Sequence, residues 1–158
     1  PQGKSLSEVS LITVKHSLIH LKSSPFQLNR VEDLFGYNVI LFQGFNYPGL
    51  DRYLKDKQII GHRSRSFESA FRLLERKDKY TAGFVAMNLR AKYNIYLAGS
   101  GMSMNNYSFT DISFIIPDYD ISLSLDPTMD SQLRKFVNRR LIKLKNEGFF
   151  TKVQAKYR

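Results

Sequence analysis

The chain of 158 residues contains no cysteine and no tryptophan. The absence of cysteine excludes disulfide bonds, zinc–thiolate sites and thiol nucleophiles from this chain. Its sequence also contains no apolar run that approaches the roughly 20 residues needed to cross a bilayer as a helix. Hydrophobic residues nevertheless make up 42% of the sequence, and the aromatic 13% consists of Phe and Tyr alone. This composition indicates a globular protein with a sizeable core rather than a disordered chain.

Acidic residues are few compared with basic ones, 14 against 24, which gives a formal net charge of +10. Most of the excess lies in residues 131–158, where nine basic residues accompany one acid, Glu147. A cationic helix of this kind could bind nucleic acid or anionic lipid. Because the same segment carries an apolar stripe that needs a protein partner, we interpret the charges as the solvated face of a packed helix. We therefore disfavour nucleic acid as a partner and keep it as an alternative.

The C-terminal segment predicts a long amphipathic helix followed by a short one. Asp130 stands where a capping residue would begin the helix, shortly after Pro127. Apolar residues recur at helical spacing along one stripe: Leu133, Phe136, Val137, Leu141 and Leu144. Gly148 is expected to end this helix, and a second apolar face follows at Phe149, Phe150, Val153 and Tyr157.

Before this segment, strand and helix patterns alternate along the chain. Residues 5–23 predict one long strand or two short ones, and further strands are expected at 38–42, 58–61, 81–87, 109–116 and 121–125. A helical turn is expected at 31–35, with helices at 49–55, after the cap Ser66, and at 88–93 with Asn88 as its cap. Residues 98–107 are expected to form a loop. The β-α-β-α-β order predicts an α/β fold, with a parallel sheet, right-handed crossovers and flanking helices.

Two pairs of titratable residues are candidate sources of chemistry. His16 and His20 lie four apart in a predicted strand, a separation too long for one metal ion, so we interpret both as packing or surface histidines. Asp118 and Asp120 would share one face of a strand, but no nucleophile accompanies them, and a hinge turn explains them better. The sequence therefore predicts no catalytic residues, no metal site, no cofactor and no enzyme activity.

A basic cluster of His62, Arg63 and Arg65 lies between a predicted strand and a predicted helix. Such a cluster could bind an anion, because guanidinium groups hydrogen-bond to carboxylate and phosphate oxygens. We favour the simpler interpretation that these residues form a solvated loop.

Six segments occur in an order and at a spacing that fit one known family: residues 31–39, 43–47, 66–74, 79–86, 119–125 and 133–157. They resemble the type II periplasmic solute-binding fold, in particular bacterial extracellular solute-binding protein family 3, whose members bind amino acids and other small polar solutes for ABC importers. The resemblance implies two lobes that close over a solute about a hinge, a periplasmic location, and an ABC transporter permease as partner.

The same resemblance divides the chain into three parts. Residues 1–22 correspond to a remnant of the first lobe and a hinge strand, residues 23–113 to the second lobe, and residues 114–158 to the return hinge strand and the C-terminal helices of the first lobe. Hinge strands are expected near residues 14–22 and 114–122. Since most of the first lobe has no counterpart, we expect an incomplete two-lobed architecture whose exposed first-lobe surface would allow a homodimer.

The resemblance also indicates the ligand site. In the family, a glycine loop after the first strand of the second lobe holds an anionic group with its backbone N–H groups at a helix start. The corresponding loop here contains Gly44, Phe45, Asn46 and Tyr47, and either aromatic ring would offer a stacking platform. Asn88 closes the segment where the family carries an acid for the ligand amine, and that segment has no acid. These departures predict a degenerate site for an amino acid.

The functional prediction is accordingly an extracytoplasmic solute-binding protein that takes a small polar solute. Two alternatives from other classes stay open, because a fold does not fix a function. One is the extracytoplasmic sensory domain of a signalling receptor. The other is a basic nucleic-acid-binding protein that uses the face of residues 131–158.

Overall fold

The computed structural model describes residues 6–156, which divide into two compact units. Unit 2 is the continuous stretch Lys15–Asp118, and unit 1 contains the described residues up to Val14 and from Tyr119 onward. The chain therefore passes between the units twice. Within residues 6–156, no helix is long and apolar enough to span a bilayer.

Unit 2 is built on a five-stranded sheet with the strand order β4-β3-β5-β2-β6. The strands are β2 (His16–Leu21), β3 (Asn38–Phe42), β4 (Ile60–Ser64), β5 (Thr81–Met87) and β6 (Tyr107–Asp111). β3 pairs in parallel with both β4 and β5, which confirms the predicted parallel core. The sheet as a whole is mixed, however, because β2 runs antiparallel to β5 and β6. β2 begins opposite the end of β5, with His16 beside Met87, so it must run in the reverse direction.

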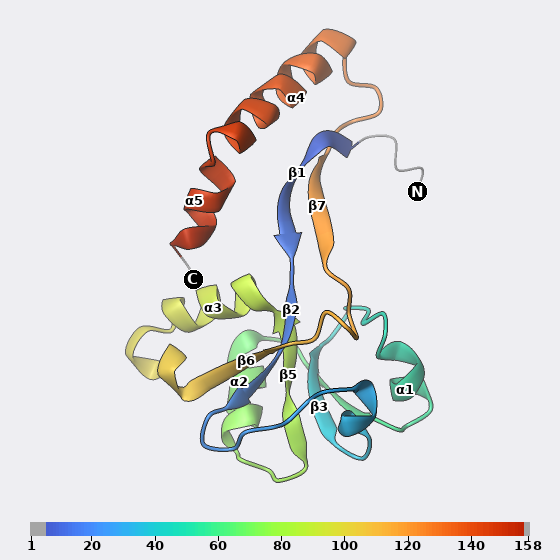
Figure 1. The fold of residues 1–158 in the computed structure, drawn as a ribbon, viewed down its shortest axis with the longest axis vertical. Helices are drawn as coiled ribbons and strands as arrows, with labels where there is room; N and C mark the ends of the chain where they lie inside the picture. Colours follow the sequence, from blue (N-terminus) through green and yellow to red (C-terminus); the bar gives the residue numbers. More distant parts are fainter. Residues whose placement is uncertain (1–5, 157–158) are drawn as a thin grey trace. The chain divides into compact units, whose positions relative to one another are not determined.

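Helices cover both faces of this sheet (Figure 1). They are α1 (Asp51–Lys55), α2 (Phe67–Glu75) and α3 (Asn88–Leu97). A 3-10 turn at Val31–Leu34 lies between β2 and β3, and two more, at Gly99–Gly101 and Met104–Asn106, lie between α3 and β6. Side chains alternate along β3, so that Val39 and Leu41 enter one apolar cluster and Ile40 enters the other. α1 belongs to the first cluster, and α2 and α3 belong to the second. A strand covered on both faces is expected to be continuously apolar, as β3 is.

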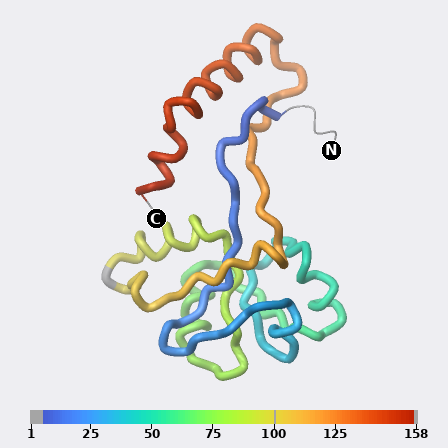
Figure 2. The backbone as a smooth tube through the Cα atoms, in the orientation of Figure 1, coloured from blue at the N-terminus to red at the C-terminus, as the bar shows by residue number. Residues whose placement is uncertain are grey.

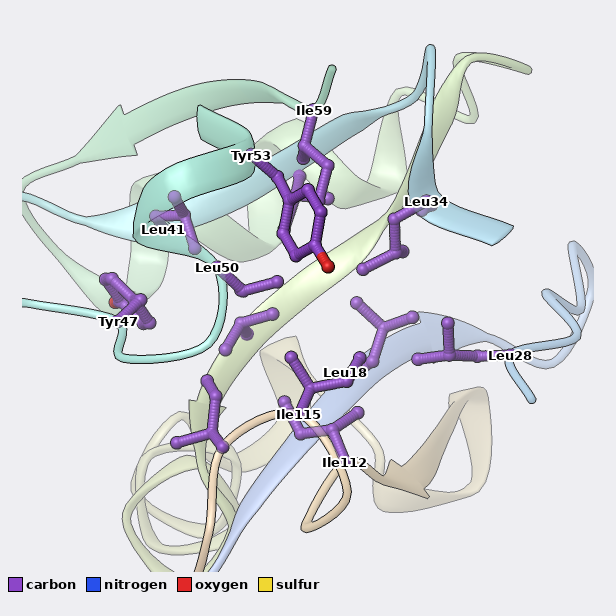
Figure 3. Close-up of a cluster of buried hydrophobic side chains, with 14 residues drawn as sticks. Leu18, Leu28, Leu34, Leu41, Tyr47, Leu50, Tyr53, Ile59, Ile112 and Ile115 are labelled. Atoms are coloured by element: carbon purple, nitrogen blue, oxygen red, sulfur yellow. The ribbon is translucent and has the colours of Figure 1, made fainter. Parts of the chain in front are cut away.

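The first cluster packs α1 and several connecting segments, among them those of Leu34, Tyr47 and Ile115, against the sheet (Figure 3). Gly49 has a φ of +93°, and a Cβ atom there would lie 1.9 Å from the carbonyl oxygen of Ile115. Only glycine therefore allows this close approach of two backbone segments. The prediction of a strand at 109–116 is wrong in its second half, since β6 ends at Asp111. Residues 112–116 turn instead, because the N–H groups of Ile115 and Ile116 both donate to the carbonyl of Ile112.

α2 begins as the sequence predicts, at the cap Ser66. The Ser66 hydroxyl accepts the N–H of Ser69 at 3.1 Å, and the Ser69 hydroxyl accepts the N–H of Ser66 at 3.3 Å. Together these bonds satisfy two backbone groups that a helix start leaves without partners. The strand predicted at 58–61 begins later, at Ile60, because Gln58 and Ile59 both donate their N–H groups to the Tyr53 carbonyl.

Unit 1 consists of a two-stranded ribbon and two helices. β1 (Leu6–Val14) pairs antiparallel with β7 (Tyr119–Ser124), and the two strands run side by side (Figure 2). α4 (Ser131–Asn146) packs on β1, and α5 (Phe149–Ala155) follows after Gly148, which has a φ of +68°. The predicted cap is confirmed, since an Asp130 carboxylate oxygen accepts two N–H groups at 2.9 and 3.0 Å.

The predicted apolar stripe of α4 is only partly covered. Leu133 and Phe136 are 50% and 57% exposed, and the one buried residue of the helix is Asn138. Asn138 accepts the N–H of Glu8 at 3.2 Å and donates to the Glu8 carboxylate at 2.9 Å. The helix therefore approaches β1 through a polar contact rather than through the whole stripe. Tyr157, which is predicted to join the second apolar face, lies outside the described residues.

The expected hinge strands are not continuous. β1 ends at Val14 and β2 begins at His16, while Phe114 and the residues up to Asp118 are not in a strand. Within each unit, a polar contact joins the two chain segments that lead to the other unit. Asp118 pairs with Lys15 at 3.2 Å in unit 2, and Asp120 accepts from the Thr13 hydroxyl at 2.6 Å in unit 1. The assignment of the units to lobes of a larger protein stays a prediction.

Candidate functional site

The carboxyl ends of three parallel strands define one edge of the sheet in unit 2. β3 ends at Phe42, β4 at Ser64 and β5 at Met87. From β3 the chain passes through α1 to β4 on one side, and then through α2 to β5 on the other side of β3. β3 and β5 therefore flank a topological switch point, the place where open α/β sheets bind ligands.

The structure brings the predicted site residues to this edge. Gly44, Phe45, Asn46 and Tyr47 follow β3 after Gln43, and Asn88 follows β5 directly. Because β3 and β5 are parallel neighbours, these segments start from adjacent strand ends. Which of these residues touch a ligand stays a prediction.

Arg63 holds the loop that follows β3. Its Nη1 atom donates to the carbonyl oxygens of Phe42 and Phe45, at 3.0 and 2.9 Å. The N–H of Gln43 donates to the Ser64 carbonyl at 2.9 Å, and Gly44 then turns the chain with a φ of +80°. Arg63 therefore holds the start of the loop to β4 through its side chain, and Gln43 does so through its backbone.

Tyr47 belongs to the core rather than to the surface of the loop. It is 3% exposed, and its hydroxyl accepts the N–H of Phe42 at 2.7 Å. Burial raises the pKa of this hydroxyl above its usual value, against the smaller opposing effects of the Phe42 N–H and Arg63. The prediction that Tyr47 offers a stacking platform is thus wrong, because its ring is enclosed by the first apolar cluster. Phe45, by contrast, is 40% exposed.

Five side chains gather at this edge, and we call them the carboxyl-edge cluster: Phe42, Phe45, Phe67, Arg63 and Arg90. The Phe42 ring centre lies 5.9 Å from that of Phe45 and 4.5 Å from that of Phe67. The Arg90 guanidinium carbon lies 5.9 Å from the Phe42 ring centre and 5.3 Å from the Phe67 ring centre. These distances fit cation–π contacts, so the cluster presents a cation on an aromatic base.

Asn88 ties the end of β5 to β2. Its N–H donates to the Lys15 carbonyl at 2.8 Å, and its side-chain amide donates to the Ser17 hydroxyl at 3.0 Å. The prediction that Asn88 caps α3 is wrong, because the cap position is Met87 and no side chain caps this helix start. The Asn88 side chain is instead directed to a neighbouring strand.

Positive charge dominates the three segments at this edge. Residues 42–50, 62–67 and 86–90 contain Arg63, Arg65 and Arg90 but neither Asp nor Glu. His62, Arg63 and Arg65 are exposed as predicted, but the prediction of a loop is wrong for His62 and Arg63, which lie in β4. Arg63 also binds two carbonyls, and Arg65 donates from Nε to the Gln43 side chain at 3.1 Å. The arginines thus support the loop as well as charging it.

Sequence reasoning missed Arg90, Phe42 and Phe67 as members of the site. One signal could have indicated Arg90, which is the third residue of α3 and follows a strand end directly. A cation in the first turn of a helix is disfavoured by the helix dipole, so its presence calls for a local explanation. The two phenylalanines gave no such signal, because aromatic residues at these positions also fit a core.

The histidines of β2 have structural surroundings. His16 and His20 are both buried, and His20 Nε2 lies 3.2 Å from the Thr110 hydroxyl. Burial lowers the pKa of His16, and the nearby Asp118 carboxylate opposes this shift only in part. Across residues 6–156, no group of three or more His, Asp or Glu side chains is placed to hold a metal ion.

A separate cavity of about 470 Å³ lies in unit 1. Its lining includes Glu8, Arg134 and Asn138, together with Pro127, Met129, Ser131 and Lys135. Glu8 and Asn138 bind each other, and Arg134 donates to the Asp126 carbonyl at 2.7 Å. These polar groups are therefore already matched within unit 1, and we place the candidate site at the carboxyl edge of unit 2.

No protein-family model matches the sequence, and neither does any curated protein. Solved structures do match. The ligand-binding core of GluR0 in complex with L-glutamate is 13% identical with a TM-score of 0.71, over 99% of this chain and 65% of that one. The fold is that of a type II periplasmic binding protein. At such low identity this likeness concerns the fold alone.

Two further structures agree. A mutant of ArgBP from T. maritima is 19% identical with a TM-score of 0.66, over 96% of this chain and 60% of that chain. The amino acid ABC transporter substrate-binding protein AbpA from Streptococcus pneumoniae, bound to L-arginine, is 16% identical with a TM-score of 0.68, over 99% of this chain and 62% of that chain. The present chain thus spans less than two thirds of the length of these chains.

Proposed function

We propose that this chain is part of an extracytoplasmic solute-binding protein, and that a small polar solute binds at the carboxyl edge of β3 and β5. The observation that carries the proposal is the carboxyl-edge cluster, which places an exposed Arg90 and an exposed Phe45 at the topological switch point. The solved structures of similar fold support binding rather than catalysis, because their names describe a ligand-binding core and substrate-binding proteins.

In this proposal each residue of the loop has a separate role. Phe45 offers an exposed ring against which the solute packs, and Gly44 and Asn46 present backbone N–H groups beside it. Asn88 fixes the end of β5 through its bonds to β2. Tyr47 does not contact the solute but positions the loop, through the hydrogen bond between its hydroxyl and Phe42.

The resemblance extends the proposal to the surroundings of the protein. A periplasmic location and an ABC transporter permease as partner follow from the family, as does closure about a hinge where the chain passes between units 1 and 2. Closure needs contacts that exist in the closed state alone, since a ligand shifts an equilibrium only by its differential affinity. The comparisons do not support the predicted homodimer, and the sensory-domain and nucleic-acid-binding alternatives stay predictions from the sequence.

Ligand screening by protein NMR tests the proposal. The isotope-labelled chain is titrated separately with L-arginine, L-glutamate, 2-oxoglutarate, glucose and inorganic phosphate. We expect saturable amide shifts at residues 43–46 and 88–90 with at least one probe. A probe at about 100 times its dissociation constant should also raise the free energy of unfolding by about 2.7 kcal/mol.

A matched pair of variants locates the site. Phe45→Ala should weaken binding, whereas Tyr80→Ala should not, because Tyr80 is an exposed aromatic residue just before β5, at the opposite edge of the sheet. Equal weakening by both variants, or the absence of saturable shifts with all five probes, would contradict the proposed function.

A further inference from the structure

We infer that the solute bound at this edge is an organic anion without an ammonium group. This inference rests on the proposed function and narrows it to one class of solute. Three observations support it: the placement of Arg90, the contacts of Arg63 and Arg65, and the partners that the neighbouring carboxylates already have.

Arg90 has the geometry of an anion-binding residue. It lies in the first turn of α3, where the helix dipole also attracts negative charge. Its guanidinium group lies over the rings of Phe42 and Phe67, and none of the ion pairs within residues 6–156 includes it. The rings attract the cation without using its N–H groups, so these remain able to bind both oxygens of a carboxylate.

Arg63 and Arg65 add charge at fixed positions. Arg63 is held by two carbonyl oxygens, at 3.0 and 2.9 Å, and Arg65 by the Gln43 side chain at 3.1 Å. A guanidinium group has five N–H donors, and these bonds use one nitrogen atom of each arginine. Neither arginine forms an ion pair among the described residues, so neither charge is neutralised there.

The carboxylates nearest to the edge in the sequence already have partners. Asp51 accepts the N–H of Tyr47 at 3.2 Å, and Glu68 pairs with Arg72 at 2.6 Å. Asp118 pairs with Lys15 at 3.2 Å. Asp111 ends β6 at this same edge of the sheet, two strands from β5, and accepts the N–H of Ser113 at 2.8 Å.

A bound ammonium group would therefore lose hydration without gaining a carboxylate, and three guanidinium groups would repel it. A carboxylate on the same ligand would meet the opposite conditions. The edge thus selects against the group that distinguishes an amino acid from its keto acid.

The sharpest test compares 2-oxoglutarate with L-glutamate, which differ only at the α-carbon and share both carboxylates. NMR titration of the full chain should give a dissociation constant at least about tenfold lower for 2-oxoglutarate, which is about 1.4 kcal/mol. Added salt should weaken this binding, because the charges at the edge are exposed to solvent.

Two variants assign the effect to Arg90. Arg90→Gln should weaken 2-oxoglutarate binding by about tenfold or more, the loss expected for a charge-assisted hydrogen bond. Arg76→Gln removes the same charge at the far end of α2, where Arg76 is the C-terminal cap, and should leave the dissociation constant within about twofold.

The outcomes separate the two proposals. Tighter or equal binding of L-glutamate with shifts at residues 43–46 and 88–90 would overturn the inference and leave the proposed function standing. Equal losses in the two arginine variants would also overturn it, since the attraction would then come from net charge. If none of the probes gave saturable shifts, the proposed function would fall, and the inference with it.

Discussion

The two units use apolar residues differently. In unit 2, Phe71, Phe84 and other large side chains are almost fully enclosed, because helices cover both faces of the sheet. In unit 1, the described residues leave Leu133 and Phe136 largely exposed. Both units carry clear apolar periodicity in the sequence. The difference teaches that periodicity predicts a helix or strand, but not whether a partner covers its apolar face.

Unit 1 relies on hydrogen bonds where unit 2 relies on packing. The buried residue of α4 is Asn138, which binds Glu8 of β1 twice, and the N–H of Leu123 donates to the Ser7 hydroxyl at 3.0 Å. A two-stranded ribbon is only marginally stable by itself in water. We therefore expect unit 2 to account for most of the free energy of unfolding.

Matched truncations of phenylalanine should show the largest difference between the units. Phe71→Ala in unit 2 removes a side chain that is 1% exposed and should lower the free energy of unfolding by about 3–5 kcal/mol. Phe136→Ala in unit 1 removes one that is 57% exposed and should change it by less than about 0.5 kcal/mol. Urea denaturation followed by amide signals in each unit measures both. Similar losses for the two variants would mean that Phe136 is covered in solution.

Two glycines with positive φ provide the next comparison. A Cβ atom at Gly49 in unit 2 would lie 1.9 Å from the Ile115 carbonyl oxygen, whereas a Cβ atom at Gly148 in unit 1 would meet nothing within 4 Å. Gly148→Ala should cost about 1 kcal/mol, from backbone strain alone. Gly49→Ala adds a steric conflict and should cost about 2–4 kcal/mol in total. Equal costs, measured by urea denaturation, would mean that the loop of Gly49 moves away from Ile115 without penalty.

Much of unit 2 could be predicted from the sequence for a physical reason. The bounds of β3 and β5 agree with the predicted strands, because both are largely apolar segments, the first followed by the Gly44 loop and the second by polar Asn88 at the start of α3. Ser66 and Asp130 were recognisable as caps because capping depends on residues only two or three positions away. The antiparallel pairing of β2 was not predictable in this way, because its partners lie far along the chain.

The candidate site was predictable only where it depends on strand ends. The family resemblance indicated the Gly44 loop and Asn88, and both follow the ends of neighbouring parallel strands. The contact of Arg90 with Phe42 is tertiary, and no local pattern encodes it. Tyr47 was misjudged because an aromatic residue in a loop looks exposed, although its spacing of three from Leu50 continues the buried face of α1.

Removing the polar contact of unit 1 should have an intermediate effect. Asn138→Ala leaves the N–H of Glu8 without its acceptor and should cost about 1–3 kcal/mol. Hydrogen exchange of the β1 amides should accelerate accordingly, while exchange in β3 and β5 should not change. Gln132→Ala, at an exposed position of the same helix, is the control and should change exchange little. Slow β1 exchange in the Asn138 variant would mean that apolar contacts, and not this hydrogen bond, hold α4.

Acidification should produce the smallest of these differences in stability between the two units. All three histidines, including buried His16, lie in unit 2. Burial lowers the pKa of His16 below 6.5, so the unfolded chain binds a proton more readily than the folded one. Stability linked to His16 is therefore complete above about pH 6.5 and is lost as the pH falls through the folded-state pKa. Between about pH 7.5 and about pH 5, the protection of unit 2 amides against exchange, measured relative to the intrinsic rate at each pH, should fall. His16→Gln should reduce that fall. An equal fall in the protection of unit 1 amides would indicate that the two units open together. The two units would then not differ in their free energy of opening.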